Sequence, residues 1–256
     1  SVGHRVAVTA RNAAKLEAIA RMDPARVLAL ALDVNDPARV RVVADEALAH
    51  FGRVDVLVNN AGYGIVGAVE ETPESELRAQ METNFFGAVS VTRAFLPTFR
   101  EQRSGAIVNI SSLGGQLSVA GFGAYSASKF ALEGISEALA QELKPFGVKV
   151  LIVEPGAFRT DFAGDAMRHM PETEPYRDTV GPTRAFARGM HNSQAGDPRK
   201  AARAIEAALD AAQTPLRLQL GADAVESVRA HANALLADLA RWEAVALGTR
   251  ADDAGR

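Results

Sequence analysis

The 256-residue chain contains no cysteine, which excludes disulfides, thiolate metal sites and a cysteine nucleophile. Its five histidines form no HExxH or similar ligand spacing, so we predict no metal site. No apolar run has the length of a membrane span, and no signal-peptide pattern opens the chain. The formal net charge of −3 offers no attraction to nucleic acid or anionic lipid. We therefore expect a cytoplasmic protein with neither kind of partner.

A glycine-rich turn is missing near the start of the chain. Residues His4–Ala10 predict a strand, and a helix over about Ala13–Arg21 follows it with no glycine between them. In a dinucleotide-binding βα unit, such a turn presents backbone N–H groups and a helix N-terminus to the pyrophosphate. No other glycine cluster of this sequence is placed to do so.

The chain does contain a regular alternation of apolar strands and amphipathic helices. Apolar runs predict strands over Val27–Leu32, Val54–Val58, Ala106–Ile110, Gly147–Val153 and Pro215–Leu220. Helices are expected over Pro37–His50, Glu74–Arg103, Pro198–Ala212 and Ala222–Leu247, and around Tyr125. With 48% hydrophobic residues, this pattern predicts one α/β domain over 1–256, a Rossmann-like doubly wound parallel sheet. The proline-interrupted segment 161–196 is expected to be irregular.

The stretch Asn109–Gly134 carries the clearest chemistry. The strand that precedes it delivers Ser112 to a glycine-broken loop, and a helix follows. Tyr125 and Lys129 are four residues apart, so they lie on one face of that helix. An ammonium close to a phenol favours the phenolate and brings the tyrosine pKa from about 10 toward neutrality. A Tyr-x-x-x-Lys spacing alone is also found in ordinary solvated helices.

With Ser112 thirteen residues before Tyr125, the set resembles the catalytic signature of the short-chain dehydrogenase/reductase family. The resemblance implies that Tyr125 is the general acid/base and that Lys129 lowers its pKa and holds the nicotinamide ribose. Ser112 would orient the substrate oxygen. Asn84 would complete a tetrad by bending its helix locally and holding a water that relays protons.

The tetrapeptide Asn59–Gly62 resembles the family's second motif, whose asparagines bond to backbone across the sheet. The resemblance implies a set of cofactor-binding residues: Asp33, Val34, Asn60, Ala61, Gly62, Tyr125, Lys129, Pro155, Gly156 and Thr160. A plain helix cap is the alternative for Asp33 or Asp36, and Asp36 followed by Pro37 fits a cap and a first helical position.

Arg11 points to NADP(H) over NAD(H). It follows the first strand where the family meets the adenosine ribose, neither Thr9 nor Ala10 is acidic, and an arginine fork suits a 2′-phosphate. A solvated arginine at a helix start is the alternative. The function expected is interconversion of a carbonyl and an alcohol. A non-catalytic scaffold that senses a nucleotide or binds a protein, and an epimerase- or dehydratase-type reaction, stay open.

The resemblance carries three further expectations. The family's first strand should lie between His4–Ala10 and Val54–Val58, so we expect roughly 25–30 residues with a strand and glycine turn upstream. Similarity to members acting on hydrophobic alcohols or ketones implies an apolar substrate. The segment 161–196 would form the lid over that substrate. The segment 221–247 would form the C-terminal helix. Packing through Phe85–Phe99 and Phe130–Leu143 implies a homodimer or homotetramer.

Overall fold

The computed structural model describes residues 3–12, 14–164, 166–190 and 193–251. Its centre is a four-stranded parallel sheet in the order β3-β5-β6-β8. These strands are β3 (Val56–Asn59), β5 (Gly105–Ile110), β6 (Val148–Pro155) and β8 (Arg217–Leu220). Ile107, Leu151 and Ile152 are fully buried, as expected for strands with helices on both faces. The predicted parallel α/β architecture is confirmed.

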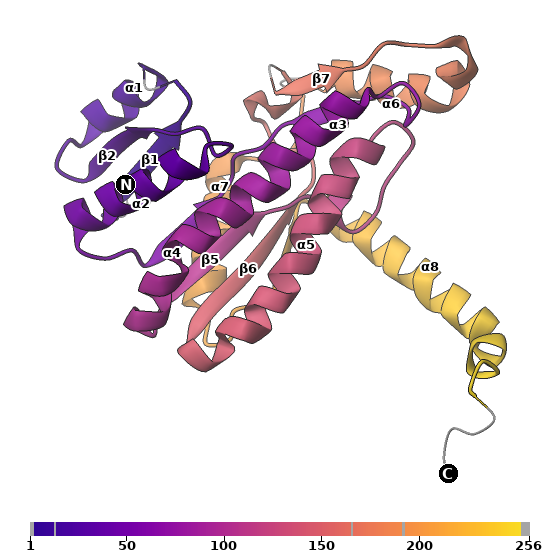
Figure 1. Ribbon diagram of the computed structural model, residues 1–256. Helices are drawn as coiled ribbons and strands as arrows, with labels where there is room; N and C mark the ends of the chain where they lie inside the picture. Colours follow the sequence, from indigo (N-terminus) through magenta and orange to yellow (C-terminus); the bar gives the residue numbers. More distant parts are fainter. Residues whose placement is uncertain (1–2, 13, 165, 191–192, 252–256) are drawn as a thin grey trace.

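Helices cover both faces of this sheet (Figure 1). On one face, α4 (Ala88–Gln102) and α5 (Gly123–Leu143) pack Phe99 and Leu139 against Ile107 and Val150. On the other face, α7 (Pro198–Asp210) packs Ala208 against the sheet. The C-terminal helix α8 (Ala222–Leu247) projects away from the body with most of its residues exposed.

The N-terminal strands form a sheet of their own. β1 (Val6–Ala10) pairs in parallel with β2 (Val27–Ala31), and α1 (Ala14–Met22) packs beside them. The predicted helix start at Ala13 lies outside the described residues. Within the described residues β1 makes no ladder with β3, so the gap expected between these two strands is present.

The first connections follow local signals. Helix α2 (Pro37–Phe51) begins where expected, because Asp36 accepts hydrogen bonds from the backbone N–H groups of Ala38 and Arg39, each at 3.0 Å. Gly52 ends α2 in a left-handed conformation with φ of 76°. The helix packs on α4, and its Ala44 lies in the same core cluster as Leu57 of β3.

The segment 161–196 is more ordered than expected. β7 (Met167–His169) pairs in parallel with β4 (Gly64–Val66), a strand that the sequence analysis did not predict. A short 3-10 turn at Asp161–Ala163 precedes β7, and another at Glu174–Tyr176 precedes the next helix. The helix α6 (Arg177–Gly189) then runs for 13 residues, so the expectation of an irregular segment was wrong.

Pro182 lies inside α6 and does not break it. A proline at this position removes the hydrogen bond to the carbonyl of Asp178, and both residues are exposed to water, which satisfies that carbonyl. The buried stripe of Val180, Arg184 and Ala187 holds the helix against the body. Tertiary packing therefore outweighs the local cost of the proline.

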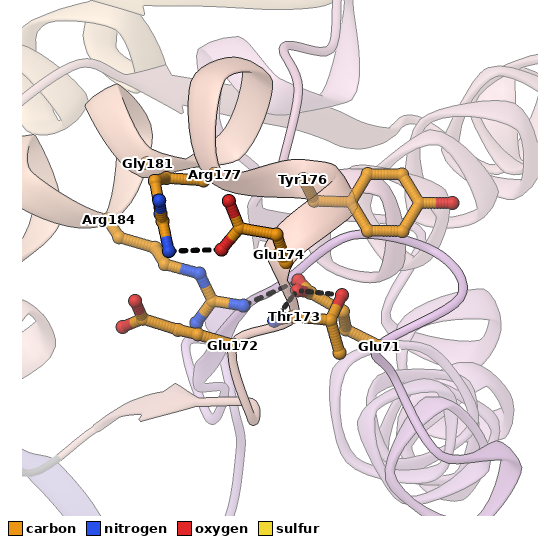
Figure 2. Close-up of a pocket in the computed structure, with 8 residues that line it drawn as sticks. All are labelled: Glu71, Glu172, Thr173, Glu174, Tyr176, Arg177, Gly181 and Arg184. Atoms are coloured by element: carbon orange, nitrogen blue, oxygen red, sulfur yellow. Dashed lines mark hydrogen bonds and ion pairs between the residues drawn. The ribbon is translucent and has the colours of Figure 1, made fainter.

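A buried ion pair fastens α6 to the loop after β4 (Figure 2). The side chains of Arg184 and Glu71 are only 3% and 2% exposed, and their closest N–O distance is 2.6 Å. Arg184 also donates to the carbonyls of Met170 and Pro171, at 2.7 and 2.9 Å. Glu71 accepts from the backbone and the hydroxyl of Thr173, at 2.6 and 2.9 Å. Every part of the pair is therefore hydrogen-bonded.

The same contacts decide the charge of Glu71. Burial raises its pKa, but hydrogen bonds from Ala68, Thr173 and Arg184 outweigh burial and lower the pKa to about 2. Because the folded pKa is depressed, the stabilisation is complete above the unfolded value of about 4.3 and is lost as pH falls toward 2. Helix α6 is thus anchored throughout the neutral range.

We predict that Arg184→Met lowers the free energy of unfolding by about 3–5 kcal/mol, because it leaves the Glu71 carboxylate buried without its cation. The control is Arg188→Met in the same helix. This change removes an exposed ion pair between Arg188 and Glu172, a residue that precedes the helix. That change should cost less than about 1 kcal/mol. Urea unfolding of both variants measures the difference, and equal costs would contradict the assignment.

Candidate active site

The predicted catalytic side chains meet where β5 ends and α5 begins. Ser112 caps the short 3-10 turn Leu113–Gly115, and its Oγ accepts a hydrogen bond from the N–H of Gly114 at 3.1 Å. Tyr125 and Lys129 lie in the first turns of α5, and both are buried. The sheet and helix therefore bring together residues that the sequence separates by up to 17 positions.

Tyr125 sits beneath aromatic side chains. Its ring centroid lies 6.1 Å from that of Phe122 and 5.6 Å from that of Phe162, and the residue is 8% exposed. Burial raises the pKa of Tyr125 to about 12, while the Ser112 hydroxyl acts to lower it. The expected displacement toward neutrality is therefore wrong for this structure. Desolvation of the phenolate beneath Phe162 is the larger effect.

Lys129 lies close to the ring of Tyr125. Its Nζ donates to the carbonyl of Ile110 at 2.8 Å and lies 5.8 Å from the Tyr125 ring centroid. Burial lowers the pKa of Lys129 to about 8, and the Glu133 carboxylate acts to raise it. The ammonium thus titrates close to the physiological range.

Asn84 occupies a deformed helix, as expected. The predicted helix Glu74–Arg103 is divided into α3 (Glu74–Met81), a π-helical turn (Glu82–Gly87) and α4. The carboxamide of Asn84 accepts from the N–H of Tyr63 at 3.1 Å and contacts the carbonyl of Tyr63 and the Ser128 hydroxyl, both at 3.0 Å. The π turn aims this side chain inward.

The backbone at Gly62 lies close to the side chains of Asn84 and Lys129. A Cβ at this position would lie 3.1 Å from Oδ1 of Asn84 and 3.7 Å from Nζ of Lys129. Glycine therefore lets the backbone after β3 pass directly beside two of the catalytic side chains.

The asparagine at the end of β3 plays a different part from the one expected. Asn59 is buried and donates to side chains, to Thr92 Oγ1 at 2.9 Å and to Asn109 Oδ1 at 2.8 Å, and not to backbone. Asn109 in turn donates to Ser136 Oγ at 2.7 Å. The sequence analysis missed Asn109 and Ser136 as supporting residues. The signal was an asparagine inside an otherwise apolar strand.

The predicted cofactor residues fall into two groups. Asn60 and Ala61 are exposed beside Gly62, and Pro155 and Gly156 lie half-buried at the end of β6. The Thr160 hydroxyl caps the turn Asp161–Ala163 by accepting from Phe162 N–H at 3.3 Å. Asn60, Ala61, Pro155 and Gly156 lie at or just after the carboxyl ends of parallel strands, where ligands bind in such sheets.

The second group belongs to the separate N-terminal sheet. Asp33 is exposed and accepts from the N–H of Asn35 at 3.0 Å, which is a local turn, while Val34 packs on Gly87. Arg11 is exposed at the end of β1, and its charge acts to lower the pKa of the Tyr63 phenol. Arg11 therefore lies within electrostatic range of Tyr63, in the loop between β3 and β4.

The residues present fit a dinucleotide. Lys129 offers an ammonium beside a glycine edge with no side chain, and exposed Asn60 and Ala61 continue that edge. Lys129 and Gly156 would hold the nicotinamide half, and Asn60 and Gly62 would lie beside the adenosine ribose. Within the described residues, no set of three or more histidine or carboxylate side chains is placed to hold a metal ion. None of the described helices combines the length and the apolar character that a bilayer crossing requires.

The sheet and grouped side chains define an oxidoreductase of the Rossmann-like class, and comparison with known proteins agrees. Residues 1–171 match the family model described as short chain dehydrogenase. The chain belongs to the short-chain dehydrogenase/reductase family. A crystal structure of a short-chain dehydrogenase from Streptomyces avermitilis superposes with a TM-score of 0.91 at 53% identity, covering 97% of this chain and 91% of that one.

Curated relatives include Oxidoreductase BOA17 of Botryotinia fuckeliana, 39% identical over 96% of this chain and 90% of the relative. A 3-ketodihydrosphingosine reductase of Bacteroides thetaiotaomicron is 50% identical over 54% of this chain and 51% of its own length. Solved relatives hold either cofactor. A metagenomic short-chain oxidoreductase with NADP has a TM-score of 0.58 and 37% identity, covering 62% and 74% of the two chains. A Burkholderia phymatum enzyme with NAD has a TM-score of 0.75 and 27% identity, covering 89% and 84%.

Proposed function

We propose that the protein is an NADP(H)-preferring oxidoreductase that interconverts a carbonyl and an alcohol, with Tyr125 as general acid/base. The observation that carries this proposal is the grouping of Ser112, Tyr125, Lys129 and Asn84 in one buried site. A phenol and an ammonium are desolvated side by side there, the first with a raised pKa and the second with a lowered one.

Tyr125 handles the proton in this proposal. With its pKa raised to about 12, the phenol is protonated at neutral pH, so it carries the proton that a carbonyl oxygen takes up on reduction. The Lys129 ammonium, with a pKa of about 8, is charged at neutral pH and stabilises the phenolate that remains. Ser112 donates to the same substrate oxygen. The nicotinamide, when bound, supplies or accepts the hydride.

An apolar small molecule is the substrate that the surroundings of Tyr125 favour. Phe122 and Phe162 pack with Val66, Met167 and Ala187 in one hydrophobic cluster that borders the phenol. Phe158, by contrast, packs into the core beside α7. The relative named 3-ketodihydrosphingosine reductase supports an apolar ketone. The absence of cysteine supports a cytoplasmic location.

We predict that Tyr125→Phe lowers kcat for reduction of an apolar ketone by at least ~10²-fold, because it removes the proton-transfer hydroxyl and keeps the ring volume. Circular dichroism and thermal unfolding check that the fold is intact. Turnover near that of the wild type would end the assignment. Binding of NADPH by the wild type, without turnover on a panel of carbonyl compounds, would favour the nucleotide-sensing scaffold.

The NADP(H) preference depends on Arg11, which offers a cation beside the loop after β3. We predict that Arg11→Asp weakens NADPH binding by about 10-fold or more and affects NADH less, because a like charge would then face the 2′-phosphate. Calorimetric titration with both nucleotides measures the ratio. Arg5→Asp, an exposed site on the same N-terminal unit, is the control for net charge. An unchanged NADPH/NADH ratio would make Arg11 a solvated residue.

A homodimer or homotetramer is the assembly that we propose. Phe86 beside α4 and Phe130 and Ile135 on α5 are 51%, 46% and 37% exposed, which is unusual for large apolar side chains on neighbouring helices. We predict that Phe130→Glu shifts the species seen by light scattering toward monomer, because it would bury a charge in the interface. A wild type that is monomeric at every micromolar concentration would contradict the proposal.

A further inference from the structure

Two carboxylates are buried behind the catalytic group. Glu133 lies on α5 one turn after Lys129 and two turns after Tyr125, so the three side chains follow one face of the helix. Glu154 lies on the neighbouring strand β6 and is 0% exposed, while Glu133 is 4% exposed. Carboxylates are almost never fully buried unless they are paired.

One guanidinium and two carboxamides hold this pair. Arg217 of β8 places its Nε 2.9 Å from Glu133 and 3.2 Å from Glu154. Gln116 donates to both carboxylates, at 3.2 and 3.0 Å, and Gln219 donates to Glu154 at 2.7 Å. Since Gln116 follows the turn that begins at Ser112, the cluster also ties the serine loop to α5 and β6.

The cluster carries more negative than positive charge. Arg217 is the cation for Glu133 and Glu154, and it also pairs with Glu137 at 2.5 Å. Burial raises the pKa of Glu133, and the charge of Glu154 also acts to raise it, while hydrogen bonds from Ser111 and Arg217 and the charge of Arg217 act to lower it. An anion that is only partly neutralised therefore lies one helical turn from Lys129.

The free oxygen of Glu133 faces the serine loop. Its Oε1 and the Oγ of Ser111 make no other hydrogen bond among the described side chains and backbone, and the Ser111 hydroxyl acts to lower the pKa of Glu133. Both atoms border Gly115, where a Cβ would lie 3.0 Å from Oε1 and 2.5 Å from the hydroxyl. A glycine at this position lets the loop close onto the carboxylate.

We propose that Glu133 is a positioning residue: its carboxylate, held by Arg217 and Gln116, keeps the Lys129 side chain charged and fixes the loop that carries Ser112. The inference rests on the proposed function for the role of Lys129, but its physical content is independent of turnover. Without the carboxylate, the contacts that offset desolvation of this buried lysine, among the described residues, are the Ile110 carbonyl and the face of the Tyr125 ring. Glu133 therefore extends the range of pH over which the ammonium persists.

The decisive measurement is the titration of Lys129 itself. The chain has five lysines, so NMR with lysine labelled by ¹³C at Cε gives five signals, of which Lys129→Arg identifies one. Removal of a neighbouring anion destabilises a cation. Glu133→Gln should therefore lower the Lys129 midpoint by about one pH unit, the size expected for charges a helical turn apart at intermediate dielectric. Glu133→Asp, which keeps the charge, should restore most of the wild-type value.

Glu137→Gln is the matched control. Glu137 lies on the same helix and pairs with the same arginine, but its side chain is 51% exposed and one turn further from Lys129. Its removal should leave the Lys129 midpoint nearly unchanged. A wild-type midpoint in Glu133→Gln, or an equal displacement in Glu137→Gln, would overturn the proposal.

A reciprocal measurement covers the case in which Glu133→Gln does not fold. Coupling between two titrations is mutual, so Lys129→Met should raise the midpoint of the Glu133 carboxyl, followed by ¹³C at Cδ and assigned through the backbone. An unchanged carboxyl midpoint would also overturn the proposal. In an active enzyme, the pKa that defines the alkaline limb of the kcat/KM profile should fall together with the Lys129 midpoint. A displaced midpoint in a protein without turnover would sustain this inference while defeating the proposed function.

Discussion

Burial of one lysine ammonium constrains the rest of the site. Taking such a charge out of water costs several kcal/mol unless it is compensated by partners. Lys129 has the carbonyl of Ile110 at 2.8 Å, at the end of β5, and an anion one turn along its own helix. The position of α5 relative to the end of β5 is therefore fixed by the geometry of one hydrogen bond, from Lys129 to the Ile110 carbonyl. The same placement puts the Tyr125 phenol above the lysine and away from water.

Buried polar contacts fix the neighbouring elements in the same way. Asn59 joins β3 to β5, the π turn delivers Asn84 to the loop after β3, and Arg217 joins β8 to α5. Each contact is directional, so each excludes small shifts that apolar packing would tolerate. The apolar layers formed by Ile107 and Leu151 supply stability, while the polar contacts supply register.

The segment after β6 is held by two separate contacts. Its Phe162 packs against Tyr125, while its helix α6 is fastened by the distant pair of Glu71 and Arg184. The contact that anchors the segment is therefore not the one that covers Tyr125. Desolvation of Tyr125 therefore depends on a segment whose attachment lies outside the catalytic group.

The sequence by itself determined the local features. The period of the apolar runs specifies the parallel α/β layers, Asp36 and Pro37 specify the start of α2, and four-residue spacing places Tyr125 and Lys129 on one face. Each of these depends on residues within one or two turns. The Ser112 spacing and Asn84 added the site through their resemblance to a family.

Only the tertiary structure decided the rest. Arg184 and Glu71 are 113 residues apart, and no local pattern pairs them or lets α6 continue through Pro182. The pKa of Tyr125 could not be read from Lys129 four residues away, because Phe122 and Phe162 bury the phenol and desolvation dominates. Long-range contacts set burial, and burial sets both the strength of an ion pair and the direction of a titration.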